Sequence, residues 1–262
     1  MLRSMTTNRN RETVATTETS LLILDLIKEQ NEASLSQILD QIDLSKTTVH
    51  RHLATLNEQG YLSKHGERYR LGMKLWHLGN RAKNDSKVLE LAERAVERLA
   101  DQTQLESQFD VEADGQMISV FSRLGNDMEA AFEPGRCFCL HTTATGKAIL
   151  AELPEARRAE IIEKRGLPSQ TEHTITSKSV LEEELRDVRR RGYAINDEEL
   201  RDGLLAVAGT IQYPDDHILG GISVGGPLYR IDREHLETGL AQPLISVIED
   251  VERALTDVDL HM

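Results

Sequence analysis

The side chains best suited to a chemical task lie within residues 45–70, where hydroxyl, imidazole and cationic groups recur at helical spacing. Ser45 is a good residue to cap a helix, because its hydroxyl can accept a hydrogen bond from a free backbone N–H. Val49, Leu53 and Leu56 follow the spacing of one buried helix face. The polar side chains between them therefore point outward, and small donors of this kind suit hydrogen bonding to base edges in the major groove of DNA.

A positively charged hairpin is expected directly after this helix. Gly60 tolerates the left-handed conformation past a helix end, and residues 61–62 and 69–71 flank a turn that contains Gly66. We expect two short strands that form a wing and set cationic side chains against phosphates. The predicted DNA-contacting residues are Ser45, Lys46, Thr47, Thr48, His50 and Arg51 in the helix and Lys64, His65, Arg68 and Arg70 in the wing. The residues expected at base edges are Thr47, Thr48, His50 and Arg51, with Lys46 and the wing residues at the backbone.

Two earlier apolar segments are expected to complete a helical module. Residues 35–41 present Leu35, Ile38 and Leu39 on one side, and residues 20–28 are dense in Leu and Ile. Together with the wing, they predict a winged helix-turn-helix domain over residues 19–72. The alternative is an ordinary small helical bundle, in which capped amphipathic helices are also common.

The distribution of charge favours a division into a DNA-binding part and an acidic part. Residues 1–84 hold 12 Lys and Arg against 9 Asp and Glu, whereas residues 85–262 hold 19 against 35. Net charges of +3 and −16 are typical of a DNA-binding module on a sensory domain, although +3 is small enough to arise by chance. The chain has 9 Lys but 22 Arg, and this acidic, lysine-poor composition suggests adaptation to high salt. Salt screens phosphate attraction, so DNA binding would depend more on base contacts and shape.

The ends of the first domain have patterns of their own. Residues 1–18 are polar and are expected to form a disordered arm that touches DNA. The arginines of this arm are Arg3, Arg9 and Arg11. Residues 73–86 are expected to form a linker helix, in which Trp76 lies on an apolar stripe suited to a dimer contact or to packing on its own domain. Neither a transmembrane segment nor a signal peptide is recognised, so we expect a cytoplasmic protein with no membrane partner.

Residues 87–262 alternate between strand and helix patterns. Asp114 and Gly115 are expected to form a hairpin turn between two strands, and a third strand is expected from about residue 130 to His141. A helix is expected over residues 179–191, with Ser179 and Glu182 at the spacing of a capping box. Hairpin strands mixed with helices predict an α+β fold.

Cys137, Cys139 and His141 form a second group with chemical potential. On a single strand alternate residues share a face, so these side chains would point together. That set could bind a thiophilic metal ion or act as a thiol reductase, although a fourth ligand is not evident. The simpler interpretation is a packed strand that lines a pocket, and we expect no metal and no cofactor.

Two other motifs are weak indications of enzymatic chemistry. The run of Asp197, Glu198 and Glu199 could supply paired carboxylates or hold Mg²⁺, but a structural acidic loop is the more common case. Residues 143–147 resemble a phosphate loop, yet His141 stands where the first glycine is needed and Ala148 where a hydroxyl is needed. We predict no catalytic residue.

Blocks of sequence along nearly the whole chain resemble the IclR-type transcriptional regulators. The blocks are SKTTVHRHLATLNEQGYL followed by YRLG, then HTTATGKAILAELP, LRDVRRRGYAINDEELRDGL and GGISVGGP. The resemblance implies a winged-helix DNA-binding domain, a linker helix and a GAF-like effector-binding domain over residues 87–262. It also implies a homodimer or tetramer that binds double-stranded operator DNA and controls a catabolic or carbon-use operon in response to a small metabolite.

The resemblance also implies the position of the effector. The effector-binding residues carried over from the family are Ala144, Thr145, Asn196, Ala206, Ser223 and Gly225, with Asp197 as a neighbouring carboxylate. Asn196 stands where some members have an acid, Ala206 where a cysteine can stand and Gly225 where a serine can stand. These departures weigh against a glyoxylate-like ligand. They leave a small carboxylate, a sugar-derived metabolite or a larger, less polar effector as alternatives.

Overall fold

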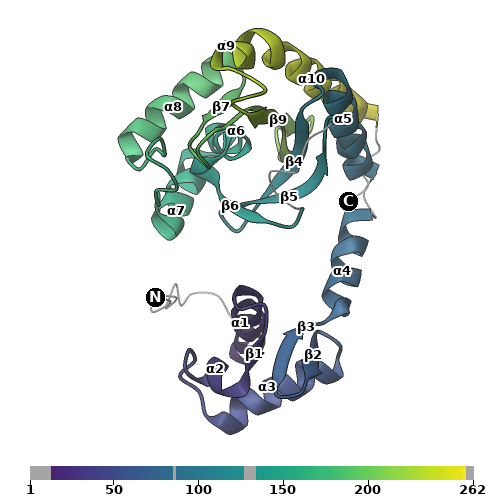
Figure 1. The fold of residues 1–262 in the computed structure, drawn as a ribbon, viewed down its shortest axis with the longest axis vertical. Coiled ribbons are helices and arrows are strands. Elements are labelled where there is room, and N and C mark those ends of the chain that lie inside the picture. Colours follow the sequence, from purple (N-terminus) through teal and green to yellow (C-terminus); the bar gives the residue numbers. More distant parts are fainter. Residues whose placement is uncertain (1–12, 85–86, 127–133, 258–262) are drawn as a thin grey trace. The chain divides into compact units, whose positions relative to one another are not determined.

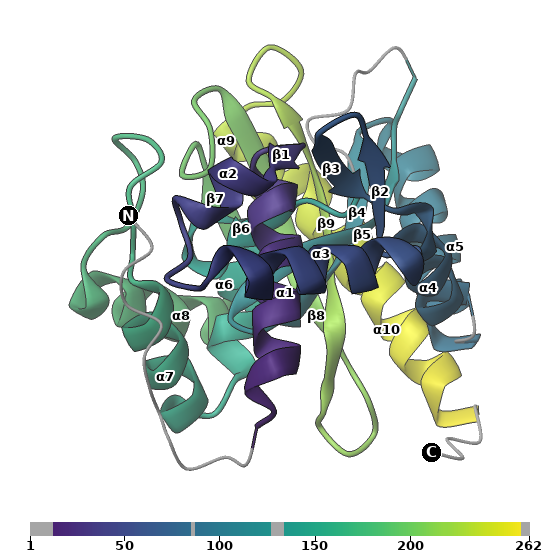
Figure 2. The same cartoon turned by 90° about the horizontal axis from the view of Figure 1, so that it is seen from below.

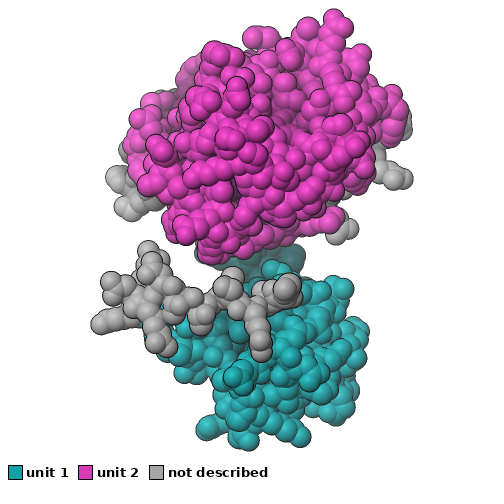
Figure 3. Space-filling model, turned by 90° about the vertical axis from the view of Figure 1, so that its left-hand side faces the viewer, with its two compact units in different colours: residues 1–85 teal, residues 86–262 magenta. Residues whose placement is uncertain are grey.

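A computed structural model of the chain describes residues 13–84, 87–126 and 134–257 (Figure 1). The chain divides into two compact units, residues 1–85 and 86–262, which Figure 3 shows in teal and magenta. Each unit has its own apolar core. Among the described helices, none combines the length and the apolar character needed to cross a lipid bilayer.

The first unit contains the expected helices. They are α1 (Ala15–Glu29), α2 (Leu35–Leu39) and α3 (Lys46–Glu58). Ser34 and Gln37 form a capping box at the start of α2, and Ser45 caps α3 by accepting a hydrogen bond from the Thr48 N–H at 3.2 Å. Val49, Leu53 and Leu56 of α3 are buried against α1 and α2, as predicted, and Figure 2 shows α3 crossing α1. The helix α1 begins four residues before the expected domain boundary at residue 19.

The wing is a small antiparallel sheet that joins directly to the linker helix. Its strands are β1 (Ala33–Ser34), β2 (Leu62–His65) and β3 (Arg68–Leu71), in the order β1-β3-β2. The strand β1 was not expected from the sequence. It pairs Ala33 with Tyr69, and it therefore brings the loop before α2 alongside the wing. The linker helix α4 (Met73–Asn84) follows after Gly72.

The second unit is built on one antiparallel sheet of six strands. The strands are β4 (Glu106–Ala113), β5 (Gln116–Arg123), β6 (Cys137–Cys139), β7 (Ala194–Asp197), β8 (Leu204–Gln212) and β9 (Ile218–Pro227). Their order is β6-β5-β4-β9-β8-β7. The Asp114–Gly115 turn between β4 and β5 has positive φ at both residues, as the hairpin pattern predicted.

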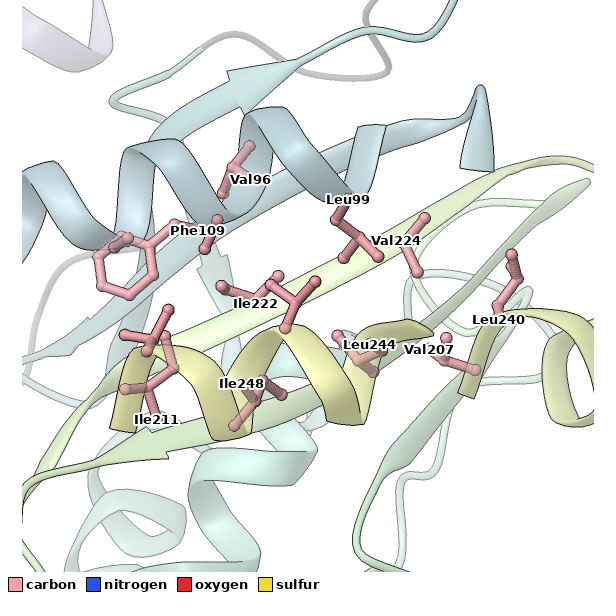
Figure 4. Packing of buried hydrophobic residues seen from close by; sticks show 14 of the residues in the cluster. Val96, Leu99, Phe109, Val207, Ile211, Ile222, Val224, Leu240, Leu244 and Ile248 are labelled. Atoms are coloured by element: carbon pink, nitrogen blue, oxygen red, sulfur yellow. The ribbon is translucent and has the colours of Figure 1, made fainter. Parts of the chain in front are cut away.

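Helices cover both faces of this sheet. On one face lie α5 (Lys87–Thr103) and α10 (Ala241–Asp257), the second preceded by α9 (Arg233–His235) and a π-helical turn (Leu236–Leu240). Figure 4 shows their side chains meeting those of β4, β8 and β9 in a continuous apolar core. On the other face lie α6 (Ala144–Glu152), α7 (Glu155–Arg165) and α8 (Lys178–Arg191), which pack with Met117 and Phe138 of β5 and β6.

Two local expectations about this unit are corrected. The strand β6 ends at Cys139, and His141 lies in a 3₁₀ turn (Leu140–Thr142), so strand alternation does not carry His141 onto the face of the two cysteines. The start of this strand, near residue 130, lies outside the described residues. The helix α8 begins at Lys178, after Ser177, so Ser179 lies inside the first turn and is not the capping residue.

The junction between wing and linker generates a test of packing. At Gly72 an added Cβ would lie 2.2 Å from the carbonyl oxygen of Gly60, a backbone atom. We expect Gly72→Ala to destabilise the first unit by about 1–3 kcal/mol, because the neighbouring backbone must shift. Hydrogen exchange of the amides in β2 and β3 of the full-length protein would measure the effect.

Gly79→Ala provides the matched control in the same segment. Gly79 lies inside α4, and beyond its own helix backbone and chain neighbours no atom of the described residues lies within 4 Å of an added Cβ. Alanine there should stabilise the helix by up to about 1 kcal/mol, since glycine is the poorer helix former. Equal effects of the two substitutions would show that close approach at Gly72 does not matter.

Candidate functional site

The outward face of α3 carries most of the polar residues that the sequence predicted for DNA contact. Lys46, Thr47, His50 and Arg51 are exposed, whereas the residues facing α1 and α2 are buried. Ser45 and Thr48 also lie at the start of α3, but their hydroxyls hydrogen-bond to each other at 2.8 Å. These two residues cap α3, and Ser45 is exposed together with Lys46, Thr47, His50 and Arg51.

The wing carries a charge compensation that the sequence did not indicate. Lys64 and His65 are exposed, and the Lys64 ammonium lies 5.6 Å from the ring centre of Tyr69. Arg68 and Arg70 both pair with one carboxylate, that of Glu32, at 2.6 Å from each Nε.

Glu32 meets both arginines because of the wing register. It directly precedes β1, which pairs with β3, and the arginines lie on the same face of β3, on either side of the buried Tyr69. Hydrogen bonds and charge from Arg70 and then Arg68 hold the pKa of Glu32 below its usual range. The two arginines are thus partly neutralised within the protein.

The second unit contains a cavity between the central strands of the sheet and the start of α6. It encloses about 480 Å³ of empty space, including the open solvent at its mouth. The described residues that line it are Glu106, Gln108, Asp110, Met117, Phe138, Thr143, Ala144, Thr145, Asn196, Leu200, Leu204, Leu205, Ala206, Ser223 and Gly225.

Six of the seven residues carried over for an effector lie on this wall. They are Ala144, Thr145, Asn196, Ala206, Ser223 and Gly225. The seventh, Asp197, lies outside it, because successive side chains of β7 point to opposite faces. Asp197 instead accepts hydrogen bonds from Arg233 at 2.8 and 2.9 Å. The expectation that Asp197 supplies the carboxylate missing at Asn196 is therefore corrected.

The carboxyl groups of the cavity come from β4, which sequence reasoning missed. Glu106, Gln108 and Asp110 occupy alternate positions of this strand and face α6, while Phe109 faces the core under α5 and α10. Polar residues at every second position of a predicted strand were a signal for this wall. The signal was ambiguous, since a solvent-exposed strand face has the same pattern.

Asp110 is the most unusual group of the wall. Its side chain is buried, and one carboxyl oxygen accepts a hydrogen bond from the Thr145 hydroxyl at 2.7 Å. The other oxygen makes no hydrogen bond of good geometry with the described residues, and the Ser119 hydroxyl lies opposite it on β5. Burial raises the pKa of Asp110 to about 7, although the hydroxyl groups of Thr145 and Ser119 favour the ionised form. Asp110 can therefore change its protonation state near neutral pH.

A buried ion pair holds two parts of the cavity wall together. Lys147 of α6 lies 2.7 Å from an oxygen of Glu199 and 3.3 Å from Glu184 of α8. The Asn196 side chain accepts hydrogen bonds from the backbone N–H groups of Glu199 and Leu200 at 3.0 and 3.3 Å. The acidic run at 197–199 is thus a structural loop that fixes Asn196 and Leu200 relative to the start of α6. Removing one partner of a buried pair typically costs about 3–5 kcal/mol.

The cysteines do not form a metal site with the nearby histidine. Cys137 is exposed and Cys139 is half-buried, and burial raises the pKa of the Cys139 thiol. His141 is buried with Nε2 at 3.1 Å from the Pro168 carbonyl oxygen. Within the described part of the chain, no group of three His, Cys, Asp or Glu residues has the arrangement of a metal site.

Comparison with known families assigns both units. Residues 17–66 match the family described as IclR helix-turn-helix domain, and residues 81–253 match Bacterial transcriptional regulator IclR C-terminal. The first match covers α2, α3, the strand β2 and most of α1, and the second covers almost all of the second unit.

Individual relatives agree with this assignment. The chain is 32% identical to the probable HTH-type transcriptional regulator ArcR of Halobacterium salinarum, over 80% of this chain and 81% of the relative. It is 26% identical to the acetate operon repressor of Salmonella typhimurium, over 89% and 87% of the two chains. Its fold is similar to that of an IclR transcriptional regulator from Alicyclobacillus acidocaldarius, with a TM-score of 0.79, 24% identity and coverage of 93% and 99%.

The raised pKa of Asp110 has a consequence for stability. A carboxyl whose pKa is higher in the folded than in the unfolded state stabilises the fold at low pH, and this contribution is lost as the pH rises through the folded value. We expect the unfolding free energy of the wild type to fall by a few kcal/mol between about pH 4 and about pH 7, relative to Asp110→Asn. Asparagine keeps the acceptor for Thr145 but cannot ionise.

Denaturant unfolding at a series of pH values would measure this difference. Asp114→Asn is the matched control, because Asp114 is exposed on the same hairpin and its hydrogen bond with Lys164 lowers its pKa. That control keeps Asp110, so it should retain the loss of stability between about pH 4 and about pH 7 that Asp110→Asn removes. Parallel pH profiles for the wild type and Asp110→Asn would mean that Asp110 ionises normally.

Proposed function

This chain belongs to the IclR family of transcriptional regulators, and we propose that it is a ligand-responsive, sequence-specific repressor or activator of an operon for carbon use. The proposal rests above all on the exposed polar face of α3, which is capped, supported by a buried apolar face and followed by a wing. Because the chain belongs to a family of transcriptional regulators, we do not propose a thiol-reductase activity for Cys137 and Cys139. The name of the acetate operon repressor supports the assignment to carbon use.

We place Arg51, Thr47 and His50 at base edges and Lys46, Lys64 and His65 at the phosphate backbone. The first three are exposed along one side of α3, which suits entry into the major groove. Ser45 and Thr48 contribute by fixing the start of the helix, whose first backbone N–H groups can also meet a phosphate. Arg68 and Arg70 contribute less charge than their number implies, since both pair with Glu32.

The effector acts by shifting a population of conformations. A small molecule in the cavity of the second unit would bind one arrangement of the protein better than another and so change the spacing of two DNA-binding modules. Two modules require a dimer. The exposed apolar side chains of α4, Met73, Trp76 and Leu78, support a dimer contact on this helix.

The function is tested by binding to duplex DNA from the promoter region of its own gene. Mapping the protein on its genome with and without candidate carbon sources would identify the operator and nominate the effector. Failure to bind any such duplex, at any salt concentration and with any ligand, would overturn the proposed function.

Substitution of Arg51 tests the assignment of base contacts. Arg51→Ala should weaken binding to the operator by about 1–3 kcal/mol, because a bidentate contact to a base is lost. Lys64→Ala is the comparison, and it should weaken binding to all sequences alike. Unchanged operator affinity would remove Arg51 from the base-contacting set, and a changed preference for one base would remove Lys64 from the backbone set.

Substitution of Glu32 tests the charge compensation in the wing. Glu32→Gln should release Arg68 and Arg70 for phosphates and steepen the dependence of log K on log[salt] by about 1–2, with a gain in non-specific affinity. Asp25→Asn removes the same charge from α1, where Asp25 pairs with Lys28, and should leave the slope almost unchanged. Equal slopes for Glu32→Gln and the wild type would show that Glu32 does not hold these arginines away from DNA.

A further inference from the structure

The wall of the cavity in the second unit is acidic. Two of its fifteen described residues, Glu106 and Asp110, are acids, and none is Lys, Arg or His. Both carboxyl groups are buried on the same face of β4. One oxygen of Glu106 accepts hydrogen bonds from Gln108 at 2.8 Å and from Ser122 at 3.0 Å. An anionic ligand would therefore approach two carboxyl groups without a lining cation to balance its charge.

The Asp110 carboxyl group favours a ligand that carries a hydrogen-bond donor. The oxygen that Thr145 does not reach is buried and makes no hydrogen bond of good geometry with the described residues, although the Ser119 hydroxyl opposite it on β5 interacts with Asp110 and helps to lower its pKa. A buried acceptor without a partner is costly, so a ligand that donates to this oxygen gains more than one that does not. An ionised ligand donor would also offset the repulsion between the two carboxylates.

The start of α6 does not provide a separate place for a ligand carboxylate. Helix N-termini attract anions, but at this one the Thr145 side chain already donates to Asp110. The Thr143 hydroxyl also accepts from the Gly146 N–H at 2.9 Å and is used as the cap. The Thr145 hydroxyl and the Gly146 N–H are therefore both used within the protein.

The remaining wall restricts the body of the ligand. Met117, Phe138, Leu200 and Leu204 contribute apolar side chains, beside the polar side chains of Gln108, Asn196 and Ser223. These side chains suit a short aliphatic chain with one charged end.

We propose that the effector is a small organic amine in its cationic form, with its nitrogen at Asp110 and its apolar body against Met117 and Phe138. This inference rests on the proposed function, since it specifies the ligand of the same effector cavity. It differs from the small carboxylate or sugar-derived metabolite expected from the sequence.

The surroundings of Asp110 determine how amine binding should depend on pH. Its strand neighbours are Ser119 on β5 and Gly221 on β9, and Thr145 faces it from α6. None of these titrates in this range, and the acid whose charge acts on it is Glu106 on its own strand. A cation favours ionised Asp110, so binding should strengthen as the pH rises and should release protons.

Isothermal titration of the full-length protein with n-butylamine, butyrate and n-butanol tests the inference, because the three probes share a body and differ in the head group. We expect the amine to bind at least about tenfold more tightly than the other two. Its affinity should rise about tenfold between about pH 6 and about pH 8, as Asp110 ionises.

Variants assign the binding to this cavity. Asp110→Asn should lose about tenfold or more in amine affinity, and Asp114→Asn, which removes the same charge from the exposed turn of the hairpin, should not. If Asp110→Asn does not fold, Glu106→Gln provides the second variant, with a weaker loss expected. Tightest binding by butyrate, amine binding that Asp110→Asn leaves unchanged, or no binding of any probe would each overturn the inference.

The outcome is separable from that of the proposed function. If the protein binds its operator but responds to a carboxylate, the proposed function stands and the amine inference is overturned. If the protein binds the amine but no duplex DNA, the proposed function is overturned and the amine inference stands.

Discussion

The alternation of side chains along β4 is the constraint on which the second unit depends. Phe109 enters the core under α5 and α10, and the next residue, Asp110, must then face α6. The same rule applies to β8 and β9, where Val207 and Val224 fill the core and Ala206 and Ser223 line the cavity (Figure 4). One sheet therefore supplies a closed apolar core and a polar binding wall. A register slip of one residue would exchange the two faces and destroy both.

The cavity is kept in shape by buried charge as well as by packing. Lys147 joins α6 to Glu199 of the acidic loop and to Glu184 of α8, and Arg191 also pairs with Glu184 at 2.8 Å. Burial opposes the charge of Glu184, but Lys147 and Arg191 together hold its pKa below the usual range. A partly satisfied network would be costly in such a site, and here each charge has a partner at short range. The wall is thus preorganised before any ligand arrives, which lowers the entropic cost of binding.

The DNA-binding unit shows a similar balance on a smaller scale. Its wing sets Arg68 and Arg70 on one face of β3, and Glu32 restrains both. Pairing of this kind reduces the net positive charge that the wing presents, while Arg51 and its exposed neighbours on α3 carry no such restraint from any described residue in the proposed contact with DNA. The restrained wing agrees with the acidic, lysine-poor composition of the chain. In such a chain we expect attraction to DNA phosphates to contribute little to sequence specificity.

The sequence by itself determined the features that follow from neighbouring residues. The cap at Ser45, the buried face of α3 and the turn at Asp114 and Gly115 depend on contacts within a few positions, and all were predicted. Resemblance between whole blocks of sequence added six of the cavity residues. Tertiary structure alone decided the pairs that cross the fold: Thr145 with Asp110 is 35 positions apart, Arg70 with Glu32 is 38, and Lys147 with Glu199 is 52. Those pairs depend on strand register and helix packing, which local spacing does not encode, and for that reason the acidic wall of the cavity and the restrained wing appeared only in the folded chain.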